Sequence, residues 1–127
     1  MKVVNLTPHC INVVAGATLD ESIRKYRGGE VVATIPSSGM VSAISNDSPA
    51  DPIVVDGVSI QSTRKEWTKV DALPEMEEAT MFIVSALYVS ACRELGIPTT
   101  NLLTVGNMVV AEDGRTIIGC TGLIRND

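Results

Sequence analysis

The clearest signal for the fold is the stretch Ile53-Val54-Val55-Asp56-Gly57-Val58-Ser59-Ile60. Two apolar runs rich in β-branched residues flank Asp56-Gly57, and an Asp-Gly pair is typical of a two-residue type I′ turn. The stretch therefore predicts a tight β-hairpin. After it, Ser62–Val70 is expected to continue as a polar strand. Before it, Asn46–Asp51 is polar and contains a proline, which predicts a loop.

The chain before this loop predicts short strands and one short helix. Thr18-Leu19-Asp20-Glu21 fits the capping box, in which Thr or Ser is followed three residues later by Glu, and it predicts a helix over about residues 19–26. Pro8 has no backbone N–H, so the first 15 residues are expected to form a hairpin or a bent strand. The strands expected here are Lys2–Leu6, Ile11–Ala15, Glu30–Ile35 and Met40–Ser45, with a turn at Pro36-Ser37-Ser38-Gly39.

The second half of the chain predicts the main helix. Thr80–Val84 has the composition of a buried strand, and Ser85 is a favourable N-cap for a helix over Ala86–Leu95. Gly96 is placed to end that helix in a left-handed conformation. Residues 75–78 predict an acidic loop. The remaining strands are expected over Leu102–Val105, Met108–Ala111 and Thr116–Cys120, with Leu123-Ile124 trailing.

These elements define the expected fold class. Strands do not alternate regularly with helices, which disfavours a doubly wound parallel sheet. The sequence predicts an α+β domain that is mainly antiparallel β, either a sheet or a half-open barrel, with the helix at about residues 86–95 packed against it. A length of 127 residues fits a single domain that spans 1–127.

The composition narrows the class of partners. The net charge of −5 disfavours nucleic-acid binding, which depends on neutralising phosphates. The apolar runs are far shorter than the roughly 20 residues of a membrane helix. The N-terminus lacks the apolar core of a signal peptide, and three cysteines far apart in sequence favour a reducing, cytoplasmic compartment. The mean hydropathy of +0.23 is high for a soluble monomer and favours a homo-oligomer, whose contacts cover apolar surface.

The cysteines and the only histidine limit redox and metal chemistry. Cys10, Cys92 and Cys120 are odd in number and far apart in sequence, so a disulfide framework is not expected. A zinc site would require the fold to gather all three with His9. The simpler interpretation is three buried thiols that act as small hydrophobes, with no metal and no cofactor.

Polar turns hold the first candidate binding residues. Asn5-Leu6-Thr7-Pro8-His9 places an amide, a hydroxyl and an imidazole within five residues, and His9 suits a general base or a hydrogen-bond donor. Ser37 and Ser38 lie in a turn that offers hydroxyl and N–H groups to an anion, although it lacks the lysine of a phosphate-binding loop. For both segments the alternative is a structural turn whose side chains cap backbone groups.

Two further places complete the candidate set. Ser85 stands at a strand-to-helix junction, where free N–H groups favour an anion, but the flanking Ile83 and Leu87 are not the glycines of a nucleophile elbow. Arg64 suits a carboxylate or phosphate, and Trp67 suits a stacked base or an interface. The alternatives are a plain helix cap and an exposed strand. The predicted ligand-binding residues are Asn5, Thr7, His9, Ser37, Ser38, Arg64, Trp67 and Ser85, and no catalytic residue is assigned.

Several motifs together resemble a known family. They are Asn5-Leu6-Thr7-Pro8-His9, Pro36-Ser37-Ser38-Gly39, Leu73-Pro74, Phe82-Ile83-Val84-Ser85-Ala86-Leu87 and Gly114-Arg115-Thr116-Ile117-Ile118-Gly119-Cys120-Thr121-Gly122-Leu123. The chain is similar over nearly its whole length to small phage and bacterial proteins with an opening "NLTPH" motif. That resemblance implies a phage or prophage setting, the cytoplasm of a bacterial host and a single domain. It implies no catalytic residue, because the family has no settled activity.

Three functional hypotheses follow. The first is a non-catalytic protein that binds and sequesters a small nucleotide-like ligand, as an anti-defence sponge for immune signals, by analogy with other compact phage proteins. The second is a small enzyme acting on a nucleotide or acyl compound, with His9 as base and Ser85 or Cys10 as nucleophile; no orienting carboxylate is evident for it. The third is a structural or partner-binding protein that uses a strand edge or an apolar patch.

Overall fold

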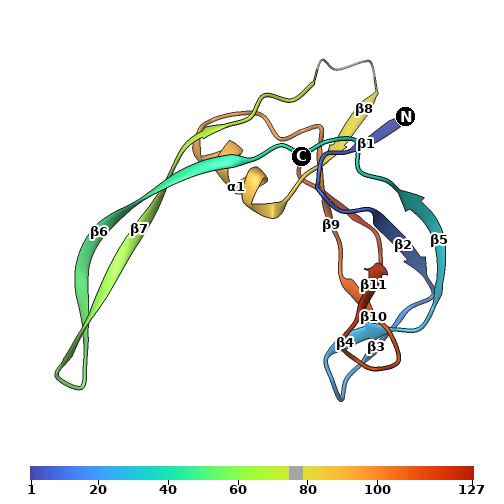
Figure 1. Ribbon diagram of the computed structural model, residues 1–127, viewed down its shortest axis with the longest axis horizontal. Coiled ribbons are helices and arrows are strands. Elements are labelled where there is room, and N and C mark those ends of the chain that lie inside the picture. Colours follow the sequence, from blue (N-terminus) through green and yellow to red (C-terminus); the bar gives the residue numbers. More distant parts are fainter. Residues whose placement is uncertain (75–78) are drawn as a thin grey trace.

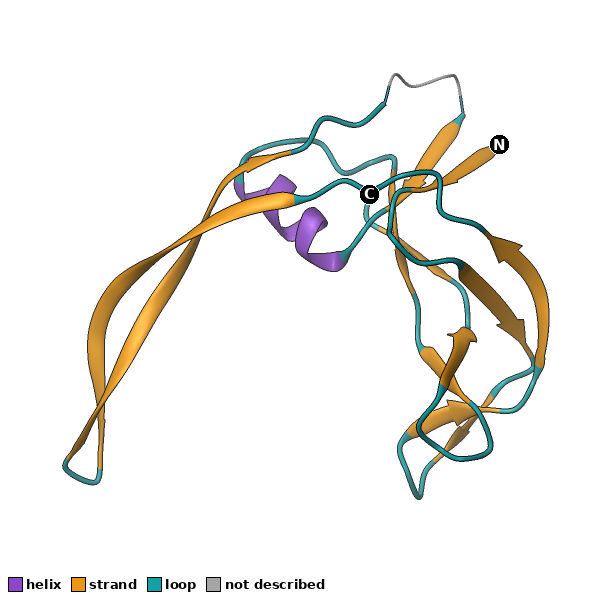
Figure 2. Cartoon of the chain, in the orientation of Figure 1, coloured by secondary structure: helices purple, strands orange, loops and turns teal. Residues whose placement is uncertain are grey.

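The computed structural model describes residues 1–74 and 79–127 and is mostly β (Figures 1 and 2). The first of its two larger sheets has four strands, in the order β1-β8-β9-β12. Its strands are β1 (Lys2–Asn5), β8 (Thr80–Ile83), β9 (Leu102–Val105) and β12 (Leu123–Arg125). The pairs β1–β8 and β8–β9 are parallel, whereas β12 is antiparallel to β9.

The second sheet has six strands in the order β3-β4-β10-β11-β2-β5. They are β3 (Thr18–Asp20), β4 (Lys25–Arg27), β10 (Met108–Val110), β11 (Ile117–Cys120), β2 (Ile11–Ala15) and β5 (Glu30–Ile35). Strands from the N-terminal and C-terminal parts of the chain pair here in parallel, as in β10–β4 and β11–β2. The expectation of a mainly antiparallel sheet is therefore corrected to two mixed sheets, and neither closes into a barrel.

The third sheet is a long hairpin, β6 (Ala43–Val55) and β7 (Val58–Val70), which we call the arm. It extends from the two mixed sheets as a curved ribbon (Figure 1). Asp56 (φ 51°) and Gly57 (φ 78°) are both left-handed at its end, which confirms the predicted type I′ turn.

The loop predicted at Asn46–Asp51 is wrong, because these residues belong to β6. Proline is tolerated there because a two-stranded ribbon has no third strand to accept a hydrogen bond from the missing N–H. The pairing is irregular between Ala50 and Ile53, which places Pro52 in a bulge. The strand expected over Met40–Ser45 begins only at Ala43.

The short helix predicted over residues 19–26 is also wrong, because β3 and β4 form a hairpin there. The Asp20 carboxylate accepts hydrogen bonds from the Ser22 backbone N–H (3.0 Å) and the Ser22 hydroxyl (2.6 Å), which fixes a turn instead of a helical cap. Arg24 has φ 54°, outside the helical region. An eight-residue helix gains little without a packed face, so strand pairing prevails.

The main helix is confirmed as α1 (Ala86–Glu94). The Ser85 hydroxyl oxygen accepts a hydrogen bond from the Tyr88 backbone N–H (3.1 Å), as expected of an N-cap. At the other end Gly96 (φ 73°) donates to the Arg93 carbonyl, and the next N–H donates to Cys92, which is a Schellman motif. Within the described residues no helix is long and apolar enough to cross a membrane.

The core consists of two clusters on opposite faces of the first sheet. Phe82 packs with α1, whereas its neighbours Met81 and Ile83 pack with Ile11 of the second sheet. Strand β8 is thus buried on both faces, which explains its apolar run Met81-Phe82-Ile83. Because β1 and β2 belong to different sheets, the first 15 residues form neither a hairpin nor one bent strand. The acidic loop expected at 75–78 lies outside the described residues.

Candidate functional site

Asn5 holds the opening motif together and is fully buried. Its Nδ2 donates to the carbonyls of His9 (2.8 Å) and Ile35 (3.0 Å), and its Oδ1 accepts from the Thr7 backbone N–H (3.0 Å) and Thr7 Oγ1 (2.6 Å). These four bonds use both donors and both acceptor positions of the amide. Asn5 therefore positions the junction between the two mixed sheets.

The two predicted polar turns lie against each other. Ser37 Oγ donates to the Thr7 carbonyl (2.5 Å), and the Ser38 backbone N–H donates to the Asn5 carbonyl (2.8 Å). A bridge between Asn5 and Ser37 continues the contact. The structure thus brings these two segments together. The polar groups that meet there form hydrogen bonds between the segments themselves.

A small hollow of about 280 Å³, which we call the cleft, lies where the opening motif, the base of the arm and the start of α1 meet. It brings together three predicted residues, Thr7, Trp67 and Ser85. Trp67 is half-buried, and Lys65 Nζ lies 5.6 Å from the centroid of its ring. The full lining is Leu6, Thr7, Pro8, Met40, Val41, Ser42, Ala43, Trp67, Ser85 and Leu87.

A larger hollow of about 920 Å³, which we call the concavity, opens between the two mixed sheets. It is lined by Thr7, Pro8, His9, Cys10, Ile11, Asn12, Val84, Ser85, Ala86, Thr104, Val105, Met108, Ile117, Ile118, Gly119, Cys120 and Ile124. His9 is the only one of these side chains that can carry a positive charge, and none is acidic. Its rim is apolar and exposed at four residues: Met108, Ile117, Ile118 and Ile124.

The arm carries a second apolar surface. Ile53 lies opposite Ile60 and Val55 lies opposite Val58, so all four side chains share one face of the ribbon. We call these four residues the apolar strip; each is exposed. The sequence predicts no role for these four residues beyond the hairpin, because the pattern alone does not show that the hairpin stands away from a core.

The remaining predicted residues do not join either hollow. Arg64 is exposed on the arm opposite Ser48, and Ser38 lines neither hollow. Cys92 and Cys120 are buried, as expected, in different clusters, but Cys10 is exposed, because it follows the loop that links the two sheets. Burial raises the pKa of the Cys92 thiol and raises the pKa of Tyr88 to about 12. The described residues contain no group of three or more potential metal ligands.

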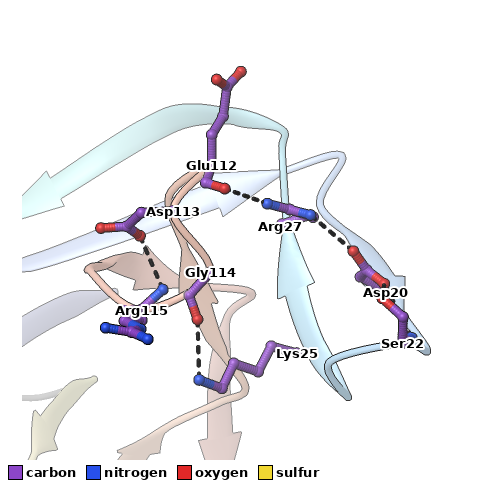
Figure 3. A network of polar contacts seen from close by, with 8 residues as sticks. All are labelled: Asp20, Ser22, Lys25, Arg27, Glu112, Asp113, Gly114 and Arg115. Atoms are coloured by element: carbon purple, nitrogen blue, oxygen red, sulfur yellow. Dashed lines mark hydrogen bonds and ion pairs between the residues drawn. The ribbon is translucent and has the colours of Figure 1, made fainter.

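A polar network that the sequence did not reveal ties β3 and β4 to the loop after β10 (Figure 3). Arg27 bonds the Asp20 carboxylate (2.8 Å) and the Glu112 carbonyl (2.5 Å), and Lys25 Nζ donates to the Gly114 carbonyl (3.0 Å). The partly exposed ion pair of Arg27 with Asp20 and the backbone acceptors indicate a structural brace. Only its Asp113-Gly114 turn has a sequence signal, since the other partners are distant along the chain.

Comparisons with protein-family models, with curated proteins and with solved structures gave no match to this chain.

Proposed function

We propose that this chain is a non-catalytic structural protein that works as an assembly of its own copies, joined through the arm. The observation that carries the proposal is the apolar strip, four β-branched side chains exposed on one face at the far end of the arm. This is the partner-binding hypothesis combined with the expected homo-oligomer.

The arm is too long and too lightly supported to be explained by the folding of one copy. Thirteen residues per strand span about 43 Å. Among the helices and other strands of the described chain, only α1 makes more than isolated contacts with the arm. A lone two-stranded hairpin is at best marginally stable in water. Burying four half-exposed Val and Ile side chains contributes roughly 1 kcal/mol each, which a second copy can supply.

The base of the arm is anchored independently of its far end. The Ser42 backbone N–H donates to the Asp71 carboxylate (2.8 Å), and the Tyr88 hydroxyl donates to the Asp71 carbonyl (2.6 Å). A shortened arm is therefore expected to leave the body folded. Residues 49–63 can be replaced by Asn-Gly, because Ser48 and Arg64 pair directly across the ribbon.

Sedimentation of the full chain and of this shortened chain tests the proposal. The full chain is expected to sediment as an oligomer and the shortened chain as a folded monomer with the same far-ultraviolet circular dichroism per ordered residue. A full chain that stays monomeric at its highest soluble concentration would refute the proposal.

A second candidate function is the binding and sequestration of a small nucleotide-like ligand. The observation that favours it is the convergence of Thr7, Trp67 and Ser85 on the cleft, where the indole ring offers a stacking surface and the hydroxyls offer hydrogen bonds. The enzyme alternative is supported by His9, Cys10 and Ser85 lining the same concavity. The phage setting implied by the opening motif stays a prediction.

Thermal melting with a panel of nucleotides and cyclic nucleotides tests the ligand hypothesis. A ligand at a hundredfold excess over Kd stabilises the native state by about 2.7 kcal/mol. The rise in Tm is expected to vanish in Trp67→Ala and to persist in Arg64→Ala, which lies outside the cleft. A compound recovered intact supports sequestration, and a compound altered by wild type but not by His9→Ala supports an enzyme. No rise across the panel would exclude the nucleotide class.

A further inference from the structure

We infer that the apolar strip of one copy seats in the concavity of a second copy, and that two copies exchange arms reciprocally. The inference rests on the proposed function and names the surface that receives the arm. The strip and the rim of the concavity are both apolar and both exposed in the single chain: Val58 and Ile117, for example, are each 61% exposed.

Charge favours this pairing of surfaces. The chain carries a net charge of −5, so contacts between copies through charged faces are opposed by repulsion. The strip contains no charged residue, and of the side chains that line the concavity only His9 can carry a positive charge and none is acidic. These two regions can therefore meet without burying an unpaired charge.

The surface area that each arrangement would bury favours arm exchange over the simpler contact of strip against strip. The four strip residues are 48–61% exposed and the four rim residues 36–61%, so one seated arm buries up to about 800 Å² and a reciprocal exchange up to about 1,600 Å², the size of a standard stable interface. Two strips packed on each other bury only about 800 Å² in total, which is the size of a crystal contact. That arrangement would also leave the rim of the concavity exposed to water.

The experiment uses the full chain with one acidic substitution on each surface and a matched control for each. Val58→Glu charges the strip, and Ser59→Glu places the same charge one residue along, on the opposite face of the arm. Ile117→Glu charges the rim, and Val32→Glu places the same charge on β5 at a residue that is equally exposed but outside the concavity. Sedimentation equilibrium measures the dimer dissociation constant of each.

Val58→Glu and Ile117→Glu are each expected to raise the dissociation constant at least a hundredfold, and the two controls to change it less than threefold. A mixture of the two dissociated variants is expected to form dimers more tightly than either variant alone. In the mixed dimer the intact arm of the Ile117→Glu copy meets the intact concavity of the Val58→Glu copy.

The other outcomes distinguish reciprocal arm exchange from assembly through the arm in general. An oligomer that Val58→Glu disrupts and Ile117→Glu does not would overturn the arm exchange and leave the arm-mediated assembly standing, with strip against strip as its contact. An oligomer indifferent to Val58→Glu, or a wild-type monomer, would overturn both.

Discussion

Asn5 shows how one buried side chain connects the two mixed sheets. It ends β1 in the first sheet, and its amide holds the carbonyl of Ile35, the last residue of β5 in the second. An asparagine suits this position because it offers both donors and acceptors to backbone groups that would otherwise be buried without partners. Ser37 serves the same junction from the other side through its bond to Thr7.

Replacing Asn5 by alanine is expected to lower the free energy of unfolding by about 3 kcal/mol, because it removes the four hydrogen bonds of a fully buried amide, including those to the carbonyls of His9 and Ile35. Thr7→Val is the comparison, since it removes one hydroxyl and is expected to cost about 1 kcal/mol. Urea denaturation measures both. A smaller loss in Asn5→Ala than in Thr7→Val would contradict the structural role assigned to the amide.

The Asp113 carboxylate gives the protein an acid-sensitive turn. Hydrogen bonds from the Thr116 hydroxyl and from the backbone N–H groups of Thr116 and Arg115 lower its pKa to about 2. A folded-state pKa below the unfolded value stabilises the fold above the unfolded pKa, and this contribution disappears as the pH falls through the folded pKa. Between about pH 4 and pH 2 the Tm of wild type is therefore expected to fall more steeply than the Tm of Asp113→Asn.

Thr116→Val provides the control for that titration. It removes the largest cause of the shift and is expected to raise the pKa of Asp113 toward its ordinary value, as measured by the pH dependence of the carboxyl resonance. An unchanged pKa in Thr116→Val would show that another group holds the carboxylate ionised.

At the scale of elements, α1 is defined by its two ends and by one buried face. Ser85 caps the start, Gly96 in the left-handed region closes the end, and Tyr88 and Cys92 face the core. All of these features are local, which is why the helix was predictable within one residue. Strands β3 and β4 contrast with it, because their capping-box pattern is equally local but lacks an apolar face long enough to hold a helix against the body.

Substituting Ser85 by alanine is expected to lower the free energy of unfolding by about 1 kcal/mol through loss of the cap. Ser85 lines the concavity, but the substitution removes only one hydroxyl and introduces no charge, so the oligomeric state is expected to stay unchanged. Urea denaturation and sedimentation check the two halves of this prediction. A loss of ligand binding or turnover without a loss of stability would instead favour a direct chemical role for the hydroxyl.

At the scale of the whole molecule, the chain divides into a body with a buried core and an arm with almost none (Figure 2). If association buries the strip, the stability of the folded chain depends on the protein concentration. The reason is that a contact made only between folded copies stabilises the native state by mass action. The Tm of the full chain is thus expected to rise with protein concentration, and the Tm of the chain with the shortened arm is expected not to. Differential scanning calorimetry over a wide concentration range measures this, and two equal slopes would count against assembly through the arm.

Residues close together in the sequence determined much of this protein without help from the fold. Asp56-Gly57 specified the hairpin turn, Ser85 and Gly96 specified the helix ends, and the β-branched runs specified strands, because turn geometry, capping and β propensity act over a few residues. The tertiary structure alone decided that Asn46–Asp51 is strand, that β1 and β2 part into different sheets, and that the side chains of Asn5 and Ser37 donate to backbone carbonyls instead of facing a shared ligand. Strand pairing and burial depend on partners far apart in the chain, so short-range patterns cannot fix them. For the same reason, the sequence does not show that the hairpin extends away from the body and exposes its apolar face.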